Sequence, residues 1–143
     1  MENSYVSHLE CSITGKKYEA NKIHGLSEAG RPLLVRYNLE KLKNEISREE
    51  ISNSKVDGLW RYSPLLPVAD PKNRISLGET LTPLIKLHRS VSYNQNDKGQ
   101  VLIKDEGRLP TGSFKARGLC LAVSMAKQFK LKHLAIPTNG NAG

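Results

Sequence analysis

Three consecutive segments between residues 101 and 136 constrain the fold of this chain most strongly. Residues 101–103 (Val-Leu-Ile) are apolar and partly β-branched, which predicts a buried strand. Apolar residues recur at helical spacing over residues 114–129, which predicts an amphipathic helix. Residues 134–136 (Leu-Ala-Ile) repeat the strand pattern. A strand, a helix and a second strand of these lengths form one βαβ unit, and such units build parallel sheets covered on both faces.

One βαβ unit does not complete a parallel sheet, because such a sheet needs several strands and two helical layers. We therefore expect an α/β fold in which residues 77–143 begin an incomplete three-layer α/β/α domain. The 143 residues would then be the N-terminal part of a larger protein. Since apolar strand surface would stay uncovered, we expect the chain alone to be marginally stable or prone to aggregate.

The first half of the chain divides into two further segments. Residues 1–37 are rich in turn residues between short apolar runs, which predicts short strands and loops. Residues 38–76 predict short helices followed by a linker. Residues 93–99 (YNQNDKG), within the third segment, predict a polar hairpin or loop.

Local signals predict where the helices of the second segment begin. Asn38 has the side chain of a helix N-cap, and Ser47 with Glu50 has the spacing of a capping box. Residues 57–66 predict another short helix, which must end or bend near Pro64.

The composition limits the classes of partner. The chain carries 22 Lys and Arg against 14 Asp and Glu, a net charge of +8, so a nucleic-acid partner has to be considered. Only 6% of the residues are aromatic, which makes base-stacking platforms scarce. We expect no nucleic-acid partner, and a non-catalytic basic binding module stays open as an alternative. No apolar run reaches roughly 20 residues and no signal peptide is visible, so we expect no membrane partner and a cytoplasmic location.

Lys115 is the first candidate for chemistry. It lies in the sequence TGSFKARG (residues 111–118), in the first turn of the predicted helix. A helix N-terminus carries roughly half a positive charge, and partial burial beside Phe114 would also disfavour protonation of the amine. Because a neutral amine condenses with aldehydes, Lys115 is a candidate for covalent binding of a carbonyl compound. By composition alone, a solvated surface position is the commoner place for a lysine.

The loop at residues 138–143 (TNGNAG) is the second candidate. Its hydroxyl and amide side chains and its small residues allow backbone N–H groups to approach a carboxylate or a phosphate. The same residues also fit an ordinary Asn-Gly turn. In a parallel sheet, this loop and the loop before Lys115 would both follow the carboxyl ends of strands, where ligands bind.

Three motifs together resemble those of the pyridoxal-phosphate-dependent enzymes of the tryptophan-synthase-β-like group (fold type II), and within this group the threonine synthase family. The motifs are LGETLTPL (77–84), TGSFKARG (111–118) and TNGNA (138–142), and the likeness covers essentially the whole chain. It implies that Lys115 binds pyridoxal 5'-phosphate covalently and that Asn141 bonds to the ring hydroxyl of this cofactor. It also implies that the substrate carboxylate is bound by the loop formed by Thr138, Asn139, Gly140, Asn141 and Ala142.

The reaction implied by the resemblance converts O-phospho-L-homoserine and water into L-threonine and phosphate, with Lys115 moving protons. A serine or threonine dehydratase, or a cysteine-synthase relative, shares these motifs and stays an alternative. The resemblance also suggests a homodimer. The family's cradle for the cofactor phosphate would lie beyond Gly143, so the chain alone is expected to bind the cofactor weakly and to be inactive. Arg117 and Lys104 have no assigned role, and a surface position is the simpler expectation for each.

The resemblance further implies a degenerate zinc ribbon in residues 1–37. Alignment with a four-cysteine ribbon places Cys11, Thr14, Leu26 and Ala29 at the ligand positions. Because a structural zinc site needs four ligands and only Cys11 supplies a thiolate, we expect no metal and a ribbon-like shape kept by packing.

Two other residues matter for the helix that begins with the SFK motif. Cys120 is expected to be a small buried apolar residue. Ala116 replaces an aspartate that often follows the lysine in this family.

Overall fold

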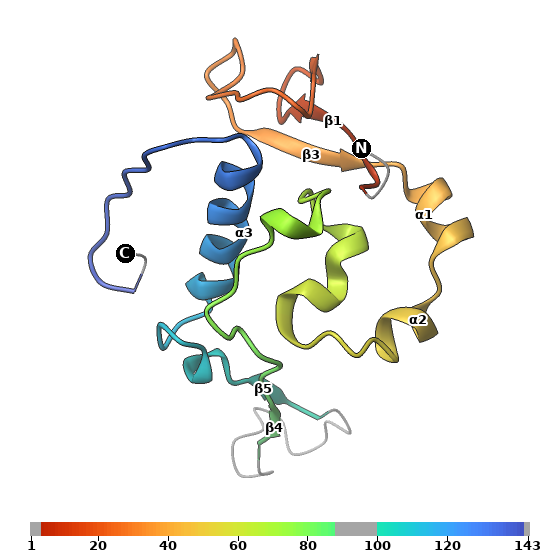
Figure 1. Ribbon diagram of the computed structural model, residues 1–143, viewed down its shortest axis with the longest axis vertical. Helices are drawn as coiled ribbons and strands as arrows, with labels where there is room; N and C mark the ends of the chain where they lie inside the picture. The colour runs from red at the N-terminus through yellow and green to blue at the C-terminus, as the bar shows by residue number, and fades with distance from the viewer. Residues whose placement is uncertain (1–3, 88–99, 142–143) are drawn as a thin grey trace.

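The computed structural model describes residues 4–87 and 100–141 (Figure 1). The loop predicted at residues 93–99 and the candidate site residue Ala142 lie outside this described part. Strands and helices are mixed along the chain, with a small sheet near the N-terminus and a strand pair in the second half.

The N-terminal segment forms a three-stranded antiparallel sheet. Its strands are β1 (Val6–Cys11), β2 (Lys17–Tyr18) and β3 (Leu33–Tyr37), in the order β2-β1-β3. Leu9 of β1 is paired with residues on both neighbouring strands, and the register with β3 shifts between Val6 and His8. The short strands predicted for residues 1–37 are therefore confirmed.

Two short helices follow the sheet, α1 (Leu39–Glu45) and α2 (Arg48–Ser52). The Asn38 side chain accepts a hydrogen bond from the backbone N–H of Lys41, 2.9 Å away. Both hydrogen bonds of the capping box between Ser47 and Glu50 are present. These caps satisfy backbone N–H groups that have no partner within the helix, so the predicted helix starts are confirmed.

The next elements are two 3-10 helices, η1 (Gly58–Leu65) and η2 (Pro71–Asn73). Pro64 lies in the last turn of η1, as the sequence predicts. Gly58 has a φ of +68°, and a Cβ at this position would lie 1.7 Å from the backbone oxygen of Glu79. Only glycine therefore allows this close approach of two chain segments.

The third segment contains β4 (Leu84–Lys86), β5 (Leu102–Lys104), the 3-10 helix η4 (Glu106–Arg108) and the helix α3 (Lys115–Gln128). The helix predicted at residues 114–129 is thus confirmed within one residue at each end. Strand β5 is found where a strand is predicted, but it pairs antiparallel with β4 and its residues are exposed.

The predicted parallel βαβ pairing is wrong for the described residues. Residues 134–136 form no strand, and Leu134 and Ile136 are 59% and 50% exposed. A parallel strand is held by hydrogen bonds to neighbouring strands. No described strand lies beside residues 134–136, while β5 has β4 as its partner through the register Ile85 to Ile103. The coarser α/β character remains, as a mixture of helices and small sheets.

Helix α3 lies between the two sheets, with its C-terminal end toward β3 and its N-terminal end toward the β4–β5 pair (Figure 1). Trp60, Val68 and Cys120 form the buried cluster beside it. Ser124 is fully buried, and its hydroxyl accepts a hydrogen bond from the N–H of Ile75 at 2.9 Å. The Trp60 indole donates to the carbonyl of the same Ile75, also at 2.9 Å. These bonds fix the chain just before the LGETLTPL motif against α3.

Cys120 is buried, as the sequence predicts, and burial raises the pKa of its thiol to about 11. It therefore packs as a small apolar residue and is not a nucleophile at neutral pH. Across the described ranges, the structure contains no helix with the length and apolarity needed to span a membrane.

Candidate functional site

Lys115 is the first residue of α3, as the sequence predicts. The turn before it is built by Gly112, which has a φ of +65° and donates its N–H to the carbonyl of Leu109 at 2.7 Å. The Ser113 hydroxyl accepts a 3.3 Å hydrogen bond from the backbone N–H of Lys115. The loop from Leu109, which is 3% exposed, therefore sets where the helix and its lysine begin.

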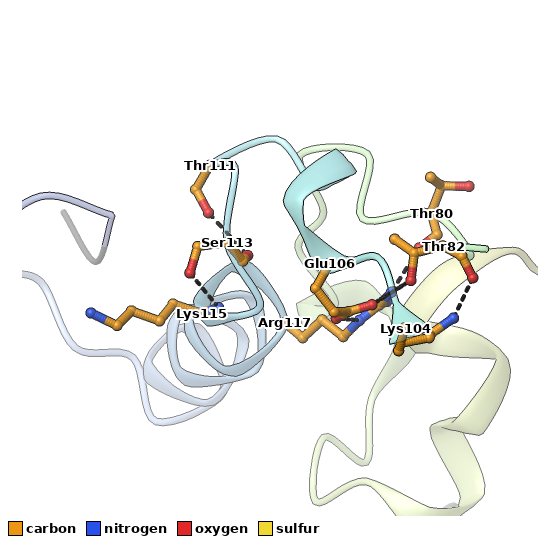
Figure 2. Close-up of polar contacts among 8 residues, drawn as sticks. All are labelled: Thr80, Thr82, Lys104, Glu106, Thr111, Ser113, Lys115 and Arg117. Carbon is orange, nitrogen blue, oxygen red and sulfur yellow. Dashed lines mark hydrogen bonds and ion pairs between the residues drawn. The ribbon is translucent and has the colours of Figure 1, made fainter. Parts of the chain in front are cut away.

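The Lys115 amine is available for chemistry. The residue is partly buried, and its Nζ forms no hydrogen bond or ion pair with any residue of the described ranges. Its side chain extends from one side of the helix start, whereas Arg117 extends from the other (Figure 2). The partial burial expected of the lysine is present, although the neighbouring Phe114 is 67% exposed.

A polar cluster lies on the opposite side of the helix start. Arg117 forms two parallel bonds to Glu106, with Nε 2.6 Å from Oε2 and Nη2 2.9 Å from Oε1. The same Nη2 donates to the Thr80 carbonyl at 3.0 Å. The Thr82 hydroxyl donates to Glu106, and Lys104 Nζ donates to the Thr82 carbonyl. Figure 2 shows these residues gathered around Glu106, with Thr80 contributing its backbone carbonyl. We call these residues the Glu106 cluster.

The Glu106 cluster is tightly held. Its central ion pair is mostly buried, with 22% of the Arg117 side chain and 20% of the Glu106 side chain exposed. The Arg117 guanidinium, together with the Thr82 hydroxyl, lowers the pKa of Glu106 to about 2. A bidentate, charge-assisted pair of this kind is stronger than an ordinary surface pair. The surface position expected for Arg117 is therefore wrong, whereas Lys104 is exposed, as expected, and only its amine contacts this cluster.

The Glu106 cluster also joins separate parts of the sequence. Thr80 and Thr82 belong to the LGETLTPL motif, and Arg117 belongs to the SFK motif. Lys104 and Glu106 come from β5 and η4 between them. Sequence reasoning missed this contact, although each residue is in or beside a motif that it singled out. The available signal was the opposite charges of Glu106 and Arg117, which lie at the two ends of a turn-rich loop.

Glu79 shapes the motif before the cluster. Its carboxylate accepts hydrogen bonds from the Ser76 hydroxyl at 2.6 Å and from the N–H of Leu77 at 3.0 Å, although only 6% of the residue is exposed. These bonds close residues 76–79 into a turn. Beside this turn lies a cavity of about 290 Å³, whose lining includes Leu119 and the buried Ala116. An aspartate side chain at position 116 would enter this apolar space, which fits the presence of alanine there.

The second candidate, the loop from residue 138, is exposed throughout its described part. The Thr138 hydroxyl donates to the carbonyl of Gly140 at 3.0 Å and accepts from its N–H at 3.1 Å. Gly140 has a φ of +143°. The loop lies on an extended segment beyond α3 (Figure 1). No hydrogen bond or ion pair joins Asn141 to Lys115 among the residues that the structure describes. The structure describes the predicted loop residues Thr138, Asn139, Gly140 and Asn141 but does not bring them to the lysine.

The N-terminal sheet contains two similar tight turns that meet at Cys11. In the first turn, the N–H of Thr14 donates to the Cys11 thiol, with N and Sγ 3.5 Å apart. In the second, the N–H of Arg31 donates to the Ser27 hydroxyl, with N and Oγ 3.1 Å apart. Cys11 Sγ and Ser27 Oγ lie 3.1 Å apart. Hydrogen bonding from Ser27 and Thr14 lowers the pKa of Cys11 to about 6.

In both turns a glycine of positive φ, Gly15 or Gly30, directly follows an aligned position, Thr14 or Ala29, and the ribbon alignment stays a prediction. Leu26 is 66% exposed and faces solvent, whereas Ser27 contacts Cys11. Within residues 4–87 and 100–141, no group of three or more His, Cys, Asp or Glu side chains is placed to hold a metal ion.

The described residues fit an aldehyde cofactor in their chemistry. The Lys115 amine, which has no partner among the described residues, is a group that condenses with an aldehyde. The nearby Glu106 carboxylate is already paired with Arg117. The hydroxyl and amide groups of the loop at residues 138–141 are donors for an anionic ligand.

Comparisons with known proteins agree with these motifs. Residues 75–143 match the family model described as pyridoxal-phosphate dependent enzyme. A threonine synthase from Methanocaldococcus jannaschii is 32% identical over 133 residues, which cover 92% of this chain and 32% of that protein. A threonine synthase from Methanosarcina acetivorans is 31% identical over 135 residues, covering 94% of this chain and 32% of that protein.

A threonine synthase from Halalkalibacterium halodurans is 40% identical over 83 residues, covering 58% of this chain and 23% of that protein. The chain thus spans about a third or less of the length of these relatives. No solved structure matches it.

Proposed function

Residues 75–143 belong to the pyridoxal-phosphate-dependent enzyme family, and on this premise we propose that the protein containing this chain converts O-phospho-L-homoserine and water into L-threonine and phosphate. The observation that carries the proposal is the unpaired Lys115 amine at the first residue of α3, inside the matched segment. The similarity to threonine synthases over nearly the whole chain supports this reaction within the family.

In this proposal, the residues of the chain bind and move protons. Bound pyridoxal phosphate supplies an aldehyde for an amine and a ring that accepts electrons from a neighbouring carbon. Lys115 Nζ would be the amine that holds it, and, once the substrate amine has taken its place, the released lysine amine would accept and return protons at the substrate carbons. Arg117 is paired with Glu106, and Lys104 donates to the Thr82 carbonyl, so we assign neither residue to the substrate phosphate.

The loop at residues 138–142 has the second role. We propose that Asn141 bonds to the cofactor ring hydroxyl and that Thr138, Asn139, Gly140, Asn141 and Ala142 bind the substrate carboxylate. Support comes from the hydrogen-bonding groups of this loop and from the positive φ of Gly140, which gives close access to the backbone.

The remaining features of the whole protein follow from the same resemblance. We propose that it completes a three-layer α/β/α domain, acts on a small amino-acid substrate, forms a homodimer and works in the cytoplasm. Residues 1–37 keep a ribbon-like shape without metal in this proposal, supported by the paired turns at Cys11 and Ser27.

The test is an activity assay on the protein that contains this chain. We expect release of inorganic phosphate from O-phosphohomoserine, loss of this activity in Lys115→Ala, and retention in Lys127→Ala, a change of the same type near the other end of α3. Formation of a keto acid from threonine without phosphate release would replace the proposal with a dehydratase. Full activity of Lys115→Ala would contradict the role of the lysine.

A further inference from the structure

The start of α3 is weakly held by its own residues. The N-cap position is Phe114, whose side chain makes no capping hydrogen bond and is mostly exposed. The backbone N–H of Lys115 donates to the Ser113 hydroxyl, but this hydrogen bond is long at 3.3 Å. Gly118 lies at the start of the second turn, and glycine weakens helices. The orientation of the first turn must therefore be fixed by contacts from outside the helix.

Arg117 supplies such contacts on the side opposite to Lys115. Two residues along a helix correspond to a rotation of about 200°, and Figure 2 shows the two side chains leaving the helix in opposite directions. Arg117 binds Glu106 through two parallel bonds and also binds the Thr80 carbonyl. A planar, bidentate contact fixes direction as well as distance.

Glu106 is fixed in turn by groups on other elements. Its carboxylate accepts a hydrogen bond from the Thr82 hydroxyl, while Lys104 Nζ donates a hydrogen bond to the carbonyl of the same threonine. The helix start is thereby tied both to the segment before β4 and to the end of β5. Ala116 is also buried, but its methyl group forms no directional hydrogen bond that could fix the rotation of the helix.

From this geometry we propose that Glu106 and Arg117 are positioning residues, which fix the rotation of the first turn of α3 so that the Lys115 amine faces the ligand side. The inference rests on the proposed function, because it assumes that Lys115 binds the aldehyde. It adds a role for two residues that do not touch the reacting atoms.

The experiment measures how Lys115 reacts with pyridoxal phosphate in the protein that contains this chain. The adduct is trapped with borohydride and located by mass spectrometry, and the yield on Lys115 is divided by the yield on Lys127 of the same helix. The variants are Glu106→Gln and Arg117→Met. A misplaced reacting group commonly costs up to a hundredfold in rate, so we expect this ratio to fall by roughly tenfold or more in both.

The two variants separate position from electrostatics. Glu106→Gln leaves the positive charge of Arg117 unpaired, whereas Arg117→Met leaves the negative charge of Glu106 unpaired, so the two variants change the local charge in opposite directions. A positional role predicts a fall in both variants. The proposal would be overturned if the ratio of adduct on Lys115 to adduct on Lys127 changed in opposite directions in the two variants, or stayed at the parental value in both.

Two control variants separate position from overall stability. Glu10→Gln makes the same chemical change at the Glu10–Arg36 pair, where Nη2 lies 2.6 Å from Oε1 in the N-terminal sheet. Ser124→Ala removes a buried hydrogen bond in the second half of α3. We expect both to keep the parental ratio. An equal fall in Ser124→Ala would overturn the proposal. A parental protein that reacts no faster at Lys115 than at Lys127 would contradict the proposed function instead.

Discussion

At the residue scale, the Glu106 carboxylate makes the free energy of unfolding depend on pH. Arg117 holds the folded pKa at about 2, below the ordinary value of 4.5. Because the folded pKa is depressed, the ion pair contributes its full stability above pH 4.5 and loses it as the pH falls through about 2. We expect Glu106→Gln to lower the free energy of unfolding by on the order of 2 kcal/mol near neutral pH.

Urea unfolding of the parent and of Glu106→Gln at several pH values checks this prediction. The difference between the two proteins should shrink as the pH falls below 4.5. A difference that stays constant down to the lowest pH would show that Glu106 contributes packing and not charge.

The two cysteines differ in their thiolate fractions. Hydrogen bonds lower the pKa of Cys11 to about 6, and burial raises the pKa of Cys120 to about 11. Both thiols are buried, at 2% and 7% exposure, so each reacts only when the chain around it opens. Because the thiolate is the reactive form, we expect iodoacetamide to modify Cys11 before Cys120 near neutral pH. Peptide mapping after timed exposure measures both rates, and Ser27→Ala should slow the reaction at Cys11. Faster modification of Cys120 would contradict the prediction.

Individual residues could be predicted where their role is local. Lys115 stands at the first residue of its helix as the sequence indicates, because the signals for a helix start lie within a few residues. The pairing of Arg117 with Glu106 could not be predicted, since it depends on how the loop at residues 109–114 folds. The loop of Asn141 has the predicted residues, but its position relative to the lysine is a property of long-range packing.

At the scale of elements, the contact between η1 and the LGETLTPL motif depends on one glycine. An alanine Cβ at position 58 would overlap the Glu79 carbonyl oxygen. We expect Gly58→Ala to lower the free energy of unfolding by about 3 kcal/mol or more, since it adds a backbone clash to the strain of a positive φ.

Gly15→Ala is the matched control for this prediction. Gly15 has a similar φ, +69°, but no atom lies within 4 Å of its Cβ position. Only the left-handed strain remains there, which costs roughly 1–2 kcal/mol. Equal losses of stability in the two variants would show that the approach to Glu79 is unimportant.

The N-terminal turns carry a prediction on metal removal. Only one thiolate is available where Cys11 and Ser27 meet, and zinc needs four ligands. We therefore expect the melting temperature to stay unchanged after treatment with a chelator. A large fall in melting temperature, with zinc in the dialysate, would contradict a ribbon held by packing.

The elements differ in how far sequence determines them. Helices α1, α2 and α3 could be predicted because their caps and periodicity are local. The direction of β5 could not, because pairing depends on which strand is its neighbour. Its partner β4 lies before it in the chain and pairs antiparallel, whereas the pattern at residues 134–136 has no partner in the described part.

At the scale of the whole molecule, apolar side chains of the strand pair are left in contact with solvent. Leu84 is 62% exposed, and Ile85, Leu102 and Ile103 are each more than 40% exposed. Apolar surface of this kind favours association. We expect the 143-residue chain to self-associate as its concentration rises and to bind a hydrophobic dye. Replacing Ile85 and Ile103 by threonine should reduce both effects, as light scattering and dye fluorescence would measure. A monomer at all concentrations with one sharp melting transition would contradict this expectation.

The measurement that tests the central claim most directly is the position of the pyridoxyl group in the protein that contains this chain. The protein is loaded with pyridoxal phosphate, reduced with borohydride, digested and analysed by mass spectrometry. The account predicts a single adduct on the peptide that contains Lys115, and none there in Lys115→Ala. An adduct located on another lysine, with Lys115 unmodified, would contradict it.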